Sequence, residues 1–129
     1  IFYKRDLLKQ VIEINLAFAL CFVVAAFISG YQGSDLASQT FQITDEQIAP
    51  HHLAGTLLLF AIFPTVILCF ASNRAKHGRG VFKGIYRIFL LACLILVTYG
   101  SYLGGELVFK HGAGVYIQGM APVEKKAGL

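Results

Sequence analysis

Two histidines lie near glycines at helical spacing. Gly100, Gly104 and His111 fall on one stripe of a helix, because about 100° per residue brings positions four and seven apart to the same face. His51 and Gly55 are four residues apart and share a helix face in the same way. Glycine leaves bare backbone beside an imidazole, so two such helices would form a slot for a flat ligand held by two imidazoles.

Haem is the planar group that this pattern favours. Neutral imidazoles are common axial ligands of haem iron, and the CxxCH motif that attaches c-type haem covalently is absent from the sequence. The expected cofactor is therefore a non-covalent haem b with His51 and His111 as axial ligands. His52 stays open as the ligand in place of His51, because a helix start cannot be placed to a single residue. The glycines expected to make room for the macrocycle are Gly55, Gly100 and Gly104. Two histidine ligands leave no open position on the iron, which indicates electron transfer and not oxygen activation.

The same residues have two other interpretations. Gly100-x-x-x-Gly104 is a common packing motif between membrane helices, and histidines at span ends often reach interfacial water. A structural subunit without a cofactor is therefore the alternative function. A pigment held by a single histidine is a further variant.

Glu106, Tyr102 and Glu13 are polar residues within the apolar runs, and each has an expected ion-pair or hydrogen-bond partner or interfacial position. Glu106 lies about 140° around the helix from the histidine stripe, so it is not a ligand on that stripe. We expect it to pair with Lys110 at i+4, or alternatively to accept a hydrogen bond from a histidine of the preceding span. Tyr102 belongs to the interfacial aromatic belt or donates to a cofactor carboxylate. Glu13 is expected to pair with Lys9.

Three apolar runs of near bilayer-spanning length carry these residues. Hydrophobic residues make up 57% of the 129 residues, and the mean hydropathy is +0.67, which is too high for a soluble domain of this size. A membrane-spanning helix needs about 20 apolar residues. The predicted fold is all-α: one integral-membrane domain over residues 1–129, with three transmembrane helices. The predicted spans are residues 11–29, 51–71 and 85–110, with loops at 30–50 and 72–84.

Local signals predict where these helices start, stop and bend. Gly30, with Gly33 close behind it, is suited to ending the first helix. Thr44 and a glutamine three residues later have capping-box spacing, which predicts a short surface helix or turn that ends at Pro50. Pro64 is expected to kink the second span.

The basic residues predict the orientation of the chain. They cluster before the first span and between the second and third, so the positive-inside rule places both clusters in the cytoplasm. The first connecting loop and the C-terminus are then outside, and His51 and His111 lie at a similar depth near the outer side. His77 falls in the cytoplasmic loop and is expected to be solvated. The basic residues concerned are Lys4, Arg5, Lys9, Arg74, Lys76, Arg79, Lys83 and Arg87.

Several functional classes are excluded by the same composition. The 11 lysines and arginines form no basic stripe interleaved with exposed aromatics, so nucleic acid is not an expected partner. The sequence contains no P-loop, no dinucleotide-binding glycine fingerprint and no nucleophile elbow. An independent soluble-type enzyme is therefore not expected.

The segment SYLGGELVFKHGAGV, residues 101–115, carries a family resemblance. It resembles the end of the bacterial membrane family known as domain of unknown function 2231, whose signature includes G-G-x-L-V-x-x-H-G-x-G-V. The resemblance extends over most of the chain and implies a small multi-pass protein of the bacterial cytoplasmic membrane, sometimes joined to c-type cytochrome modules. Members usually have four spans, the first with its own histidine near a proline. Here either that span lies upstream of Ile1 or the subunit does without it.

The sequence thus predicts a membrane-embedded b-type cytochrome subunit of a larger complex. Electrons are expected to pass between a quinone or partner subunit and an acceptor at the outer face. The expected partners are membrane lipids, other membrane subunits and c-type cytochromes.

Overall fold

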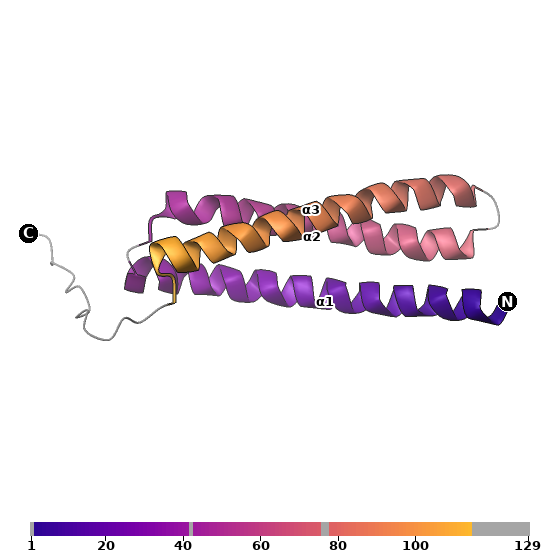
Figure 1. The fold of residues 1–129 in the computed structure, drawn as a ribbon, viewed down its shortest axis with the longest axis horizontal. Helices are drawn as coiled ribbons and strands as arrows, with labels where there is room; N and C mark the ends of the chain where they lie inside the picture. The colour runs from indigo at the N-terminus through magenta and orange to yellow at the C-terminus, as the bar shows by residue number, and fades with distance from the viewer. Residues whose placement is uncertain (1, 42, 76–77, 115–129) are drawn as a thin grey trace, which may run out of the picture.

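Three long helices make up the fold in the computed structural model, which describes residues 2–41, 43–75 and 78–114 (Figure 1). They are α1 (Phe2–Phe41), α2 (Asp45–Arg74) and α3 (Arg79–His111), and the described residues contain no strand. All three helices are long and apolar enough to cross a membrane. The all-α prediction with three candidate membrane spans is therefore confirmed. The expectations for His77 and for the tail from Val115 onward lie outside the described residues.

Helix α2 is the centre of the bundle. It packs against both α1 and α3, whereas no Cα atoms of the described parts of α1 and α3 come within 8 Å of each other. In the most apolar stretch of each helix, 22% of the residues are buried in α2, against 6% in α1 and 6% in α3. The outer faces of α1 and α3 therefore carry exposed apolar side chains, as a lipid-facing surface requires.

The apolar core lies nearer one end of the bundle. Leu16 of α1, Ile62 and Cys69 of α2, and Cys93 of α3 form a buried cluster. Thr65 is fully buried beside it, and its hydroxyl donates to the carbonyl of the residue one turn earlier at 2.7 Å. A hydroxyl satisfied within its own helix can be buried at low cost.

The prediction that the first helix ends near Gly30 is wrong, because α1 continues to Phe41. Gly30 and Gly33 do not adopt positive φ angles, unlike Gly78, Gly112 and Gly114 at turns and helix ends. Glycine is well tolerated in membrane helices. The hydroxyl of Ser34 also donates to the carbonyl of Tyr31 at 2.7 Å, so this polar side chain is satisfied within the helix.

The predicted start of a helix at Thr44 is confirmed, but its predicted end at Pro50 is wrong. Thr44 is the N-cap of α2, and its backbone N–H donates to Oε1 of Gln47 at 3.0 Å. Pro50 lies near the start of α2 and Pro64 lies further along, and the helix is continuous through both. A proline near a helix start removes little hydrogen bonding. The helix that forms the second span therefore begins at Asp45, before Pro50, and has no break there.

The third helix ends at a glycine in the left-handed conformation. Gly112 has φ +70°, and its N–H donates to the carbonyl of Val108 at 3.1 Å. This left-handed residue stops α3 and makes His111 its last residue.

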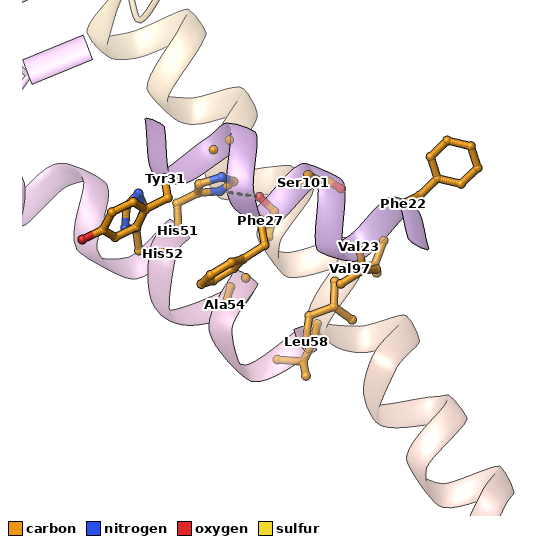
Figure 2. A pocket seen from close by; sticks show the side chains of 16 residues that line it. Phe22, Val23, Phe27, Tyr31, His51, His52, Ala54, Leu58, Val97 and Ser101 are labelled. Carbon is orange, nitrogen blue, oxygen red and sulfur yellow. Dashed lines mark hydrogen bonds between the residues drawn. The ribbon is translucent and has the colours of Figure 1, made fainter. Parts of the chain in front are cut away.

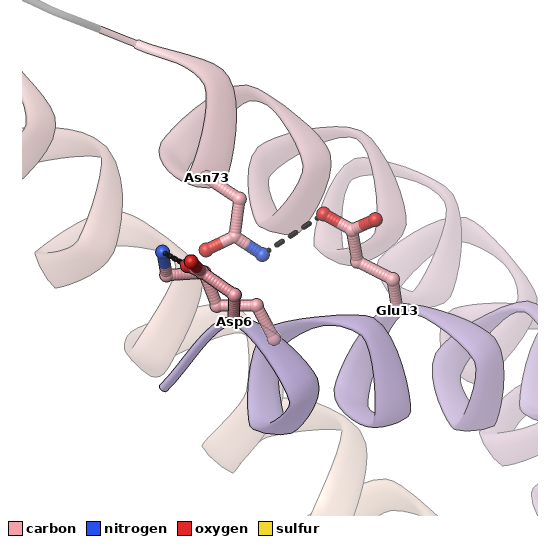
Figure 3. Close-up of polar contacts among 4 residues, drawn as sticks. Asp6, Glu13 and Asn73 are labelled. Atoms are coloured by element: carbon pink, nitrogen blue, oxygen red, sulfur yellow. Dashed lines mark hydrogen bonds and ion pairs between the residues drawn. The ribbon is translucent and has the colours of Figure 1, made fainter. Parts of the chain in front are cut away.

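The predicted pairing of Glu13 with Lys9 is wrong. Asn73 of α2 donates to the Glu13 carboxylate at 3.0 Å (Figure 3). Arg74 lies 3.9 Å from the same oxygen, while Lys9 pairs with Asp6. The Glu13 side chain is only 18% exposed. A carboxylate that is mostly removed from water needs a hydrogen-bond donor, and the Asn73 amide of the neighbouring helix supplies it. This contact fastens α1 to the end of α2.

We predict that the bond between Glu13 and Asn73 contributes measurable coupling. In a double-mutant cycle with Glu13→Leu and Asn73→Leu, the coupling free energy should be about 0.6 kcal/mol and at most about 1.7 kcal/mol. Unfolding of the purified protein in detergent, followed by circular dichroism, measures it. Glu13→Gln keeps the acceptor and should change stability much less, and Asp6→Asn tests an exposed pair worth little. Strictly additive effects of the two leucine substitutions would contradict the assignment.

Candidate functional site

A cavity of about 410 Å³ lies between α1 and α3, with α2 as its floor (Figure 2). Its volume falls in the range of about 300–1,000 Å³ that is usual for small-molecule sites. The cavity lies toward the end of the bundle where the predicted topology places the outer side. Val23 and Leu58 line it and also pack on the apolar core, so the cavity continues from the core. Its walls are mostly apolar, and its polar side chains are His51, His52, Tyr31 and Ser101.

His51 is fixed in one tautomer by the backbone of α3. Its Nδ1 lies 3.0 Å from the carbonyl oxygen of Gly100. A carbonyl only accepts hydrogen bonds, so Nδ1 carries the proton, and in the neutral ring Nε2 keeps a free lone pair. Among the described residues no group bonds Nε2. Histidines that ligate metals through Nε2 characteristically donate Nδ1–H to a carbonyl or carboxylate in this way.

Gly100 and Gly104 of α3 lie in close contact with side chains of α2. A Cβ atom placed on Gly104 would lie 3.1 Å from Cε1 of His51, which is tighter than normal contact. A Cβ atom on Gly100 would lie 3.6 Å from Cβ of Ala54, which is ordinary contact. Gly100 and Gly104 both line the cavity. The side chains nearest to the space that a Cβ atom on them would fill are Ala54 and His51, both of α2.

Gly55 faces the opposite helix. A Cβ atom on Gly55 would meet the ring of Phe27 of α1 at 4.0 Å. Gly55 therefore admits an aromatic side chain of α1 beside the cavity, and both residues line it.

His111 has a different partner and the opposite tautomer. Its Nδ1 lies 3.1 Å from Nε2 of Gln47. Oε1 of Gln47 accepts from the backbone N–H of Thr44, so the nitrogen of that amide faces His111 and donates to Nδ1. A neutral His111 must then carry its proton on Nε2, and that nitrogen has no lone pair for a metal until the Gln47 contact is given up.

The structure does not bring His51 and His111 together in the cavity. His51 lines it and His111 does not. His111 contacts Gln47, one helical turn before His51, while the His51 ring lies against Gly104, two turns before His111. Two axial ligands of one metal would need their nitrogens each about 2 Å from it. The contacts of the two imidazoles favour separate roles.

His52 lines the cavity beside its neighbour and meets an aromatic residue of α1. Its ring centroid lies 6.0 Å from that of Tyr31, with the planes tilted by 35°. Figure 2 shows His51, His52 and Tyr31 near one end of the cavity, and Val23, Leu58 and Val97 at the other. The cavity therefore has a polar, aromatic end and an aliphatic end.

The other two predicted site residues lie outside this cavity. Tyr102 is 63% exposed on α3 and is not a lining residue. Glu106 forms an ion pair with Lys110, which confirms the pairing expected from their spacing. Neither side chain is positioned to contact a ligand in the cavity.

Within the described residues, no three or more His, Cys, Asp or Glu side chains converge on a point where they could hold a metal ion. A metal held only by the protein needs such a set. A metal already held in a macrocycle needs only one or two axial ligands from the protein.

Comparison with protein-family models, with curated proteins and with solved structures gives no match. The resemblance to domain of unknown function 2231 therefore stays a prediction.

Sequence reasoning missed Gln47 and Tyr31. Gln47 lies four residues before His51 and extends the stripe of His51 and Gly55 by one turn, but the expected helix end at Pro50 cut that stripe. Tyr31 was placed beyond the first span because α1 was expected to stop at the preceding glycine. Continuous helices through both segments would have brought these residues to the site.

We predict that Gly104→Ala and Gly100→Ala differ in effect. The new methyl group of Gly104→Ala would meet Cε1 of His51 at 3.1 Å, so the ring must move, and destabilisation of about 1–3 kcal/mol is expected. Gly100→Ala should change the unfolding free energy by less than about 0.5 kcal/mol.

Unfolding of both variants in detergent measures this difference. Gly105→Ala is the matched control, because a Cβ atom there meets nothing within 4 Å. Equal stability of the Gly104 and Gly105 variants would contradict the packing described for His51.

Proposed function

We propose that this chain is a membrane-embedded subunit that binds haem b, with His51 as its axial ligand. The observation that carries the proposal is the hydrogen bond from Nδ1 of His51 to the Gly100 carbonyl at 3.0 Å. In the neutral ring this bond leaves Nε2 with a free lone pair, on a residue that lines a mostly apolar cavity. An oriented, neutral imidazole in an apolar setting is what a haem iron needs from a protein.

The two ends of the cavity match the amphiphilic character of haem. Val23, Leu58 and Val97 would contact the apolar ring, while Tyr31 and His52 would donate to carboxylates at its edge. When bound, haem supplies one-electron oxidation and reduction. The protein residues hold it, orient it and keep water from its apolar faces.

An electron-transfer role follows from that chemistry. We propose that the subunit works in a larger complex, with a quinone, partner membrane subunits or c-type cytochromes as donor and acceptor. The exposed apolar faces of α1 and α3 leave room for lipids and for such partners.

A cofactor-free structural subunit is the second candidate. The observation in its favour is the close packing of Gly104 on His51 and of Gly100 on Ala54, since small residues at such positions drive association of membrane helices. In this case His51 would serve only to bind the α3 backbone.

Substitution of His51 separates the two candidates. His51→Ala should remove the Soret band of haem-reconstituted protein, whereas His111→Ala should retain it. His51→Asn is the matched control, because its amide can still donate to Gly100 but ligates iron poorly. It should fold and lack the band. Added imidazole should restore the band in His51→Gly by occupying the vacated space.

Visible spectra of these variants, with circular dichroism as the check of folding, give the readout. A colourless wild-type protein that stays folded with haem in excess would favour the structural subunit. Equal bands in wild type and folded His51→Asn would exclude His51 as the ligand.

We further propose that the protein lies in the bacterial cytoplasmic membrane, with the α1–α2 connection outside and the α2–α3 connection in the cytoplasm. The support is the basic cluster around the second connection and the acidic residues near the first. The cavity then opens toward the outer half of the bilayer.

Labelling of single cysteines tests this orientation. In a background without Cys21, Cys69 and Cys93, Thr40→Cys should react with a membrane-impermeant maleimide added to intact spheroplasts, and Gly80→Cys should react only after lysis. The reverse pattern would contradict the proposed orientation.

A further inference from the structure

We infer that the protein supplies one axial ligand at this site, so that one axial position stays open for a small neutral diatomic ligand such as carbon monoxide or nitric oxide. This inference rests on the proposed haem site with His51 as ligand. It departs from the two-histidine arrangement that the sequence suggested. It follows from which ligand-type side chains the cavity contains and where they come from.

The second histidine of the cavity is on the wrong helix to complete the coordination. Axial ligands approach a haem iron from opposite faces of the ring. His52 is the next residue after His51 on α2, so both side chains project from the same wall. The ring of His52 also lies against Tyr31.

The opposite wall offers almost no ligand. Helix α1 contributes Ala26, Phe27 and Gly30, among other residues, and these cannot coordinate iron. The cysteines do not line the cavity: Cys21 is exposed, and the other two are buried. Tyr31 is the one lining side chain of α1 that could coordinate, and it lies at the polar end beside His52.

His111 is committed elsewhere. It does not line the cavity, and its Nδ1 accepts from Gln47. Ligation through Nε2 would require a change of tautomer and the loss of that bond. The protein therefore provides one axial ligand in this arrangement.

An open position against apolar walls selects its ligand by size and charge. The polarity and hydrogen-bond donors on that side decide what binds to the iron. Phe27 and Ala26 offer no donor, so anions such as cyanide or azide gain nothing there, while an uncharged diatomic molecule loses little hydration.

The test uses the full chain, purified in detergent and loaded with haem. The ferric protein should give a high-spin electron paramagnetic resonance signal, and the reduced protein should bind carbon monoxide stoichiometrically with a shift of its Soret band. His111→Ala, at a residue that does not line the cavity, should behave like wild type in both measurements.

A histidine introduced opposite His51 sharpens the test. Ala26→His should convert the haem to a low-spin form with two histidine ligands and abolish carbon monoxide binding. Ala25→His is the matched control, because Ala25 is exposed and does not line the cavity. It should leave the high-spin signal and the binding unchanged.

A low-spin wild-type protein that does not bind carbon monoxide would overturn the inference. If His111→Ala then gained carbon monoxide binding, His111 would be the second ligand and the two-histidine site would stand. A change of the spin state in Tyr31→Phe, with the haem content unchanged, would identify Tyr31 as a ligand and overturn the inference as well. Wild-type protein without any haem band would overturn the proposed function itself. The presence of the band therefore separates a failure of the proposed function from a failure of this inference.

Discussion

The hydrogen bond from His51 to the carbonyl of Gly100 is the contact on which the site depends. In an α-helix that carbonyl already accepts from the backbone N–H four residues later, so His51 uses its second lone pair. A side chain on Gly104 would stand where the imidazole lies. Bare backbone on α3 therefore does two things: it exposes an acceptor, and it lets a ring from α2 reach it. Together these set the tautomer of His51 and leave its other nitrogen without a protein partner among the described residues.

The arrangement of the three helices divides the bundle into a packed half and an open half. Leu16, Ile62 and Cys93 join all three helices in one apolar cluster, and Glu13 fastens α1 to the end of α2 beyond it. Toward the other end, α1 and α3 are separated across α2, and the cavity fills the space between them. The apolar cluster and the Glu13 contact thus lie away from the cavity. The open half keeps few apolar contacts of its own, so a bound planar group would add to the packing there.

Much of this architecture follows from the sequence, because three apolar runs and a high mean hydropathy leave few alternatives to a helical membrane bundle. Spacing placed Gly100 and Gly104 on one stripe with His111, and His51 on a stripe with Gly55. In the structure, the imidazole that lies against Gly100 and Gly104 is that of His51. Spacing within a helix does not reveal which neighbour fills the space beside a glycine, and here the neighbour is His51 itself. The partner of His111 escaped prediction for a related reason: Gln47 was assigned to a short helix ending at Pro50, whereas α2 runs through it.

The tautomers of the two histidines test the account most directly, without any cofactor. In protein labelled with ¹⁵N-histidine and held in detergent at a pH where both rings are neutral, long-range proton–nitrogen correlation spectra identify the protonated nitrogen of each ring. The account predicts opposite tautomers: the proton on Nδ1 in His51 and on Nε2 in His111. A proton on Nε2 of His51 would contradict it, because that ring could then neither donate to Gly100 through Nδ1 nor offer a free Nε2 to the cavity.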